Sequence, residues 1–261
     1  MTPGVLRVRG LSARLGSRPI LEGLDLPDLP AGRLVAVAGP NGSGKSTLLK
    51  SVAGLIRAHS DELRLGTVDL RGSDAAERAE HMRYLPQSLP PVLHMTVIEA
   101  VLVAIRVRRQ LSTGEALALA QATLRAVGIA ELGTRMLDEL SGGQRQLVGL
   151  AQALCHEPAI LLLDEPLASL DLNHQLHTMR LLVQLARERQ LLIVLVVHDL
   201  NTVLRHADLA ILLSAGRIVC QGPPRQVITP QSLAQTFSVR ARIELCSRGL
   251  PHVLIDGLLS D

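Results

Sequence analysis

Aromatic residues are nearly absent from the 261-residue sequence, which has one tyrosine, Tyr84, one phenylalanine, Phe237, and no tryptophan. The 47% of residues that are apolar must therefore form a core of aliphatic side chains, large enough for one sizeable α/β domain. Proteins that bind single-stranded nucleic acid by base stacking need several aromatic rings at their surface. The composition therefore argues against that class of protein.

Strong charge and long hydrophobic runs are also lacking. The formal net charge is only +3, with both signs interspersed, so we expect no nucleic-acid partner. The longest apolar run, residues 191–197, is far shorter than the roughly 20 residues of a spanning helix. The first ten residues contain no apolar segment of the kind found in signal peptides. We therefore expect a protein of the cytoplasm that does not itself cross a membrane.

The cysteines show no pattern of disulfides or metal ligands. Cys155, Cys220 and Cys246 are odd in number, far apart and without metal-binding spacing. We expect free thiols in a reducing compartment.

A phosphate-binding loop is the strongest motif. Residues 39–47, GPNGSGKST, follow a short apolar strand predicted for residues 33–38 and precede an apolar helix. Glycines allow backbone N–H groups to approach phosphate oxygens, and the helix N-terminus adds unpaired donors. Lys45 would reach the β- and γ-phosphates, and the Ser46 hydroxyl would hold Mg²⁺. A chance match is the alternative, but the strand and helix on either side favour nucleotide binding.

Two carboxylates follow a second buried strand, predicted for residues 159–163. Ligands of α/β proteins bind at the carboxyl ends of parallel strands. Asp164 fits the carboxylate that holds Mg²⁺ together with Ser46. Glu165, one residue further along, could polarise a water molecule for attack on the γ-phosphate.

Four further candidates are weaker when taken singly. The loop Ser141-Gly142-Gly143-Gln144 could bind an anion or could merely cap a helix. Gln87 lies after a strand-like segment and could contact Mg²⁺ or be an ordinary surface residue. His198 follows the apolar strand 191–197 and could contact the γ-phosphate. Asp171 could cap a helix or lie in an interface.

The segments around these motifs alternate in character. Residues 5–38 predict short strands of an antiparallel sheet that leads into the phosphate-binding loop. Residues 75–82 predict a short helix, and residues 88–139 a helical insertion with a capping box at Ser112 and Glu115. Beyond it the α/β pattern resumes. A last helix is predicted to open at Thr229-Pro230, and the mixed tail could end in a final strand.

The order and spacing of the motifs resemble those of the ATP-binding-cassette (ABC) ATPases. GPNGSGKST is similar to the Walker A motif, LPQ to the Q-loop, LSGGQRQ to the family signature, ILLLDEP to Walker B, ASLD to the D-loop and VVHD to the switch-histidine loop. The resemblance covers residues 5 to about 230. It implies an α/β fold with a RecA-like P-loop core, an N-terminal antiparallel β-subdomain and an inserted helical subdomain. It implies one ATPase domain over residues 1–240, with residues 241–261 as a tail packed on the core.

The same resemblance implies a set of site residues, with ATP and Mg²⁺ as ligands. Glu165 would be the catalytic base, His198 the sensor of the γ-phosphate and Gln87 a catalytic and metal-contacting residue. The residues implied for ATP binding are Gly39, Pro40, Asn41, Gly42, Ser43, Gly44, Lys45, Ser46, Thr47 and Leu15. The implied metal ligands are Ser46, Gln87 and Asp164. The signature loop would consist of Ser141, Gly142, Gly143 and Gln144.

The implied assembly is a homodimer in which two copies pair head to tail. ATP would lie between the P-loop of one copy and the signature loop of the other, with Asp171 at the dimer interface. An integral membrane permease would dock beside Gln87, and a periplasmic or lipoprotein substrate-binding protein would act indirectly. The subunit would then lie peripherally on the cytoplasmic face of the plasma membrane.

One position departs from the family pattern. Many ABC ATPases stack the adenine on an N-terminal aromatic residue, but the matching pair here is Leu15-Gly16. We expect Leu15 to replace the stacking residue, with Arg14 as a candidate to lie over the ring. Loss of aromatic stacking would weaken nucleotide binding modestly.

The second half is similar to the importer ATPases for iron–siderophore chelates, haem and vitamin B12. The similarity lies in Leu170 to Gln175 and in residues 197–201 and 221–230. The segment 103–109 differs from those importers, and its basic run Arg106 to Arg109 is expected to be a solvated helix face. The alternatives are an ATPase of another ABC transporter class or a soluble, non-transport ABC ATPase. A small-molecule kinase fits less well because it has no use for LSGGQ.

Overall fold

A six-stranded sheet forms the centre of the computed structural model, which describes residues 4–88, 94–108 and 110–259. Its strands, in spatial order, are β13 (Arg217–Gly222), β12 (Leu209–Ser214), β5 (Leu34–Ala38), β11 (Leu192–Val196), β10 (Ile160–Leu163) and β9 (Met82–Leu85). All neighbours are parallel except the edge strand β13, which pairs with β12 as an antiparallel hairpin.

Alternate residues of the central strands face two different cores. In β5, Leu34, Ala36 and Ala38 belong to one buried cluster. Val35 and Val37 belong to the other. A strand that is buried on both faces needs a continuous apolar sequence, which explains why the segments 34–38, 160–163 and 192–196 contain only aliphatic residues.

One face of the sheet is covered by the P-loop helix and two small antiparallel sheets. The elements on this face are α1 (Lys45–Val52), the sheet of β4 (Leu29–Pro30), β1 (Val5–Arg9), β7 (Glu62–Leu65) and β8 (Val68–Asp69), and the sheet of β3 (Arg18–Leu24), β2 (Leu11–Leu15) and β6 (Ala58–His59). The N-terminal segment thus forms strands in two sheets, where the sequence predicts a single one.

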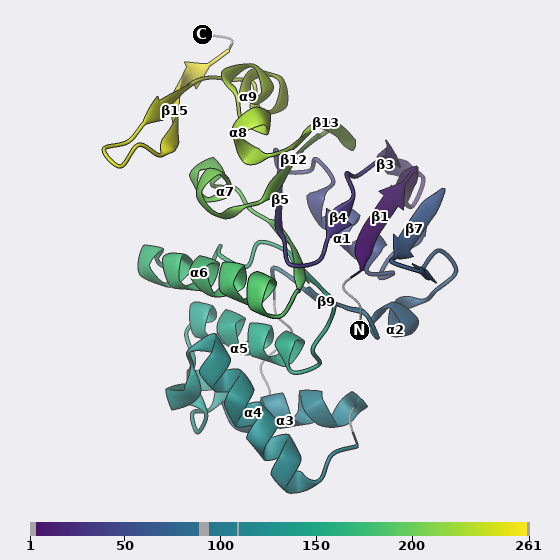
Figure 1. Ribbon diagram of the computed structural model, residues 1–261, viewed down its shortest axis with the longest axis vertical. Coiled ribbons are helices and arrows are strands. Elements are labelled where there is room, and N and C mark those ends of the chain that lie inside the picture. The colour runs from purple at the N-terminus through teal and green to yellow at the C-terminus, as the bar shows by residue number, and fades with distance from the viewer. Residues whose placement is uncertain (1–3, 89–93, 109, 260–261) are drawn as a thin grey trace.

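Helices cover the other face and extend beyond it. They are α3 (Val97–Arg108), α4 (Thr113–Val127), η1 (Ala130–Leu132), η2 (Leu137–Glu139), α5 (Gly142–Leu154), α6 (Leu172–Glu188), α7 (Leu200–His206), α8 (Pro224–Val227) and α9 (Pro230–Phe237). Figure 1 shows α3 and α4 at one end of the molecule, separated from the sheet by α5. The capping box predicted at Ser112 is present, and the helix predicted to open at Thr229-Pro230 begins there, with Thr229 as its N-cap. The predicted helical insertion includes residues 89–93, which lie outside the described residues, as does Arg109 of the basic run.

The chain ends in a hairpin of β14 (Val239–Leu245) and β15 (Pro251–Leu258). The hairpin lies at the opposite end from α3 and α4 (Figure 1). The hairpin contacts α7 through the Asn201 side chain, whose oxygen accepts a hydrogen bond from the Val253 backbone N–H at 2.8 Å. Among the described residues, each helix is too short or too polar to cross a bilayer.

The helix predicted over residues 75–82 is shorter in the structure. It forms α2 (Ala75–Arg78), and Met82 instead opens β9, opposite Ile160 of β10. Arg78 is 7% exposed, and its Nη1 donates to the carbonyl oxygens of Ser51, at 2.8 Å, and Val52, at 3.0 Å. Both carbonyls lie in the last turn of α1, where the helix itself supplies few donors. The Gly54 backbone N–H donates to the Ser51 carbonyl at 3.2 Å, and Arg78 adds a charged donor to both carbonyls.

We predict that Arg78→Ala lowers the free energy of unfolding by about 2 kcal/mol or more, because it leaves buried carbonyl groups without a charged donor. The measurement is thermal or urea unfolding followed by circular dichroism. Arg71→Ala is the control, because Arg71 forms a solvent-exposed ion pair with Asp69 and such pairs contribute little. Equal unfolding midpoints for the two variants would contradict the capping role of Arg78.

Candidate nucleotide site

The carboxyl ends of four neighbouring parallel strands bring the predicted residues together. β5 leads into the loop of residues 39–47, β9 into Gln87, β10 into Asp164 and Glu165, and β11 into His198. An open pocket of about 470 Å³ lies at this edge. Its lining residues are Leu15, Arg18, Ile20, Asn41, Gly42, Gly44, Lys45, Ser46, Thr47, Gln87, Glu165 and His198.

Two glycines of the loop have no room for a side chain. A Cβ atom on Gly39 would lie 1.9 Å from the Leu213 carbonyl oxygen. A Cβ atom on Gly44 would lie 2.7 Å from the Leu21 side chain, and its φ of 104° is in the left-handed region. The loop is therefore held close to the neighbouring backbone. The helix α1 begins within the motif, at Lys45 after its N-cap Gly44, and its first N–H groups have no partner within the helix.

The loop also contains buried polar groups that suit a phosphate chain. Lys45 is 5% exposed, and its ammonium donates to the carbonyl oxygens of Gly39, at 2.9 Å, and Pro40, at 2.8 Å. Burial lowers the pKa of Lys45, while the carboxylates of Glu165 and Asp164 act in the opposite direction. The Ser43 hydroxyl is buried and has no partner among the described residues. An anion with several oxygens would supply that missing partner.

Asp164 is held at both carboxylate oxygens and is 3% exposed. The Ser46 hydroxyl donates to Oδ1 at 2.9 Å, and the Tyr84 hydroxyl donates to Oδ2 at 2.8 Å. Burial, followed by the hydrogen bond to Asp164, raises the pKa of Tyr84 well above its usual value, so the phenol remains a donor. The oxygen atoms of Ser46 and Asp164 are the hard ligands that Mg²⁺ prefers, so these residues fit a magnesium ion beside the phosphates.

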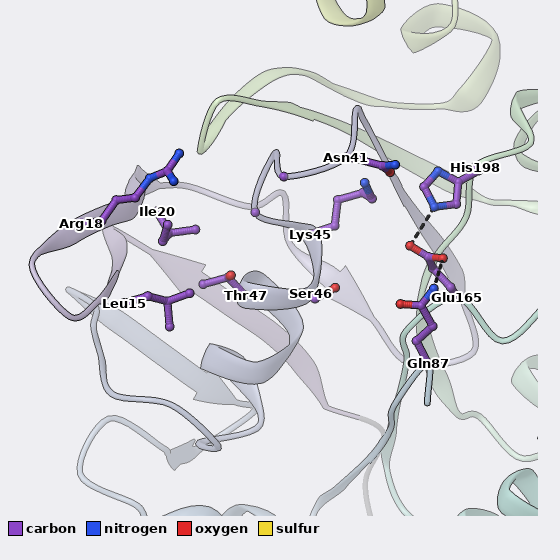
Figure 2. Close-up of a pocket in the computed structure, with 12 residues that line it drawn as sticks. Leu15, Arg18, Ile20, Asn41, Lys45, Ser46, Thr47, Gln87, Glu165 and His198 are labelled. Carbon is purple, nitrogen blue, oxygen red and sulfur yellow. Dashed lines mark hydrogen bonds and ion pairs between the residues drawn. The ribbon is translucent and has the colours of Figure 1, made fainter. Parts of the chain in front are cut away.

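Glu165 contacts the other two predicted catalytic residues, by accepting a hydrogen bond from Gln87 and by a close side-chain contact with His198. Gln87 Nε2 lies 2.7 Å from Glu165 Oε2, and His198 Nε2 lies 2.7 Å from Glu165 Oε1. Figure 2 shows the three side chains meeting at one end of the pocket, beside Lys45 and Ser46. The φ of Glu165 is +51°, a strained value for a residue with a side chain, and such strain is common where geometry serves function.

The opposite end of the pocket is formed by aliphatic groups and one arginine. Leu15 and Arg18 are cross-strand partners in β2 and β3, and both line the pocket together with Ile20 (Figure 2). Arg14, which the sequence suggested, donates instead to the Ser17 carbonyl oxygen and is not among the described lining residues. Sequence reasoning missed Arg18. The two-residue Gly16-Ser17 connection between Leu15 and Arg18 was the signal that could have found it, because such a turn pairs the flanking residues.

The predicted signature loop lies elsewhere on the same chain. Ser141 caps α5, as the sequence suggested, and it forms a capping box with Gln144. Gly143 packs so closely on the 169–170 segment that a Cβ atom would lie 2.7 Å from the Leu170 side chain. Ser141 and Gly142 are exposed. Within the described ranges, none of the residues 141–144 lines the pocket that contains Lys45.

Asp171 follows this contact and caps α6. Its carboxylate accepts from the His174 backbone N–H at 2.9 Å, and this bond is the main reason why the pKa of Asp171 lies below its usual value. The side chain is 66% exposed. Asp171 and the signature loop therefore lie at one surface, in contact through residues 169–170.

Comparison with known proteins identifies the family. The profile of the ABC transporter family matches residues 22–168. A hemin import ATP-binding protein of Rhizobium meliloti is 36% identical, over 96% of this chain and 98% of that protein. An iron(3+)-hydroxamate import ATP-binding protein of Bacillus subtilis is also 36% identical, over 91% of this chain and 89% of that protein.

A solved structure agrees with these relatives. A chain of an inward-facing ABC transporter, described as of the metal-chelate type, superposes with a TM-score of 0.82 at 25% identity and covers 97% of both chains. Its similarity extends over the sheet, the helical segment and the C-terminal hairpin, because nearly the whole chain is matched. With the family profile and the two relatives, this places the protein among the ATP-binding proteins of the ABC transporter family.

Proposed function

We propose that this chain is the Mg²⁺-dependent ATPase subunit of an ABC importer and that it works as a homodimer. The observation that supports the proposal is that the predicted site residues lie at two separate places on one chain. The pocket holds the groups expected to bind phosphate and the general base, whereas residues 141–144 lie outside it. In a head-to-tail pair, the exposed N-terminus of α5 in one copy would close over the phosphates held by the other copy.

The residues of the loop would hold the phosphate chain. Backbone N–H groups of residues 39–47 and the buried Ser43 hydroxyl would donate to phosphate oxygens, and Lys45 would turn from its own loop carbonyls to the β- and γ-phosphates. Ser46, Asp164 and Gln87 would hold Mg²⁺, which when bound neutralises charge that develops on the phosphates. Leu15, Arg18 and Ile20 would contact the base.

Glu165 would act as general base for the attacking water. Its carboxylate is already oriented by Gln87 and His198, each at 2.7 Å. When nucleotide and water enter, these two side chains can turn to the metal and the γ-phosphate and leave Glu165 free to accept a proton. Gln87, Glu165 and His198 follow the three neighbouring strands β9, β10 and β11, so their meeting depends on how these strands pair.

The transported substrate would be an iron chelate such as haem or a siderophore, or a related corrinoid. This rests on the relatives named for hemin and iron(3+)-hydroxamate import and on the metal-chelate type transporter. Closure of the ATPase dimer would drive a conformational change in a separate membrane permease. A substrate-binding protein would deliver the substrate to the other side of that permease. The subunit would lie on the cytoplasmic face of the membrane, with residues 1–240 as the ATPase domain and residues 241–261 as its tail.

The helical segment that follows Gln87 in the sequence would offer a surface for the permease. On α3, Val103 is 54% exposed and Val107 is 74% exposed. Arg106 lies between them and donates to the Thr113 hydroxyl of α4 at 3.3 Å. Because residues 103–109 differ from the corresponding segment of the siderophore, haem and vitamin B12 importers, we propose that this segment matches a permease specific to this system.

We predict that Glu165→Gln keeps ATP binding but lowers the turnover rate by at least about 100-fold, since it removes the general base and keeps the shape. The same variant should accumulate as an ATP-bound dimer. ATPase assays and size-exclusion chromatography with Mg·ATP measure both effects. Turnover within a few-fold of the parent protein would refute the role of Glu165.

We predict that Leu15→Tyr tightens ATP binding about two- to tenfold, because it restores a stacking surface for the base. Arg18→Ala should weaken binding, and Arg14→Ala is the matched control because Arg14 is bound to the Ser17 carbonyl. Equilibrium binding of ATP and GTP measures affinity and base selectivity. An unchanged ATP affinity and ATP/GTP ratio in Leu15→Tyr would contradict the proposal that this end of the pocket holds the base.

A further inference from the structure

Tyr84 is the only tyrosine of the chain and lies outside the motifs considered above. It is in β9, directly opposite Leu162 of the parallel strand β10. Asp164 is two residues beyond Leu162, so it leaves the sheet on the same face. The register therefore places the tyrosine diagonally beside the Walker B-like carboxylate, within reach of a long side chain.

The hydrogen bonds around Asp164 come from two separate elements. Ser46 donates from α1 to Oδ1 at 2.9 Å, and Tyr84 donates from β9 to Oδ2 at 2.8 Å. A carboxylate held at one oxygen can still rotate about its Cβ–Cγ bond, whereas donors at both oxygens fix its plane. Asp164 is 3% exposed, so water can hardly replace either donor.

The Tyr84 ring is held in place by packing. The half-buried Tyr84 side chain packs against the core cluster that also contains Leu48 and Leu49 of α1. The ring therefore packs against the same buried cluster that holds α1, the helix that carries Ser46. Tyr84 is not one of the described residues that line the nucleotide pocket, so it can influence the ligands only through its neighbours.

We propose that Tyr84 is a positioning residue, which fixes the Asp164 carboxylate for Mg²⁺ and thereby sets the magnesium affinity of the nucleotide complex. The inference rests on the proposed Mg·ATP function. Groups that orient metal-binding side chains commonly change metal affinity by 10- to 100-fold when they are removed. Tyr84 would thus affect the metal-dependent part of nucleotide binding and leave the metal-free part unaltered.

The test compares Tyr84→Phe with the parent in a Glu165→Gln background, so that ATP persists. The substitution keeps the ring and its packing and removes only the hydroxyl. ATP affinity is measured by equilibrium binding in EDTA and at increasing Mg²⁺. We expect the Mg²⁺ concentration for the half-maximal rise in affinity to increase about tenfold. The affinity in EDTA should stay within about twofold of the parent.

A double-mutant cycle distinguishes an action through Asp164 from a general structural effect. Tyr84→Phe should have no further effect on the Mg²⁺ requirement once Asp164→Asn is present. An unchanged Mg²⁺ requirement in Tyr84→Phe alone, or equal losses of ATP affinity with and without Mg²⁺, would overturn the role of Tyr84. A parent protein whose ATP binding does not respond to Mg²⁺ would overturn the proposed function as well.

The role of Tyr84 can also be tested without substituting Tyr84 itself. Because the chain has a single tyrosine, ring-labelled protein gives one tyrosine NMR signal. In the Glu165→Gln protein with ATP, adding Mg²⁺ should shift this signal, since the acceptor Asp164 then shares its charge with the metal. A signal that does not move when Mg²⁺ raises ATP affinity would contradict the proposal.

Discussion

Parallel pairing of β5, β11, β10 and β9 is the constraint on which the site depends. In a parallel sheet the carboxyl ends of the strands meet at one edge, so segments separated by more than 100 residues end beside each other. The phosphate-binding loop, Gln87, the Asp164-Glu165 pair and His198 each follow one of these strands. A slip of one residue in any strand would turn its side chains to the other face and separate the catalytic groups.

The two faces of the sheet serve different parts of this site. On one face, α1 and the antiparallel sheets support the phosphate-binding loop and place Leu15 and Arg18 at the far end of the pocket. On the other face, α5 and α6 begin near residues 141 and 171 and present a second surface. The sheet therefore separates the nucleotide pocket from the loop that we propose completes the pocket of a second copy.

Much of this could be predicted from sequence because the responsible interactions are local. The strand–loop–helix around Lys45, the helix N-caps at Ser112 and Thr229 and the buried strand before Asp164 each depend on residues close together in the chain. The alternating pattern of residues 239–245 was also a local signal, and β14 could have been predicted from it.

The remaining contacts were not predictable because they depend on register between distant segments. Tyr84 reaches Asp164, 80 residues away, only because β9 pairs with β10 in one register. Arg78 meets the end of α1 because α2 folds back onto it. The sequence around each of these side chains gives no sign of its hydrogen-bond partner. The partners are defined only by the three-dimensional arrangement of the strands and helices.

The central claim, that two copies form each site, can be tested by mixing two defective proteins. One carries Lys45→Ala and the other Ser141→Arg, each with Glu165→Gln so that ATP is retained. Alone, neither protein should dimerise with Mg·ATP. The mixture should form heterodimers in sedimentation experiments. In such a heterodimer one of the two sites combines the intact P-loop of the Ser141→Arg protein with the intact signature loop of the Lys45→Ala protein. A mixture that stays monomeric, under conditions where Glu165→Gln alone dimerises, would contradict the shared site.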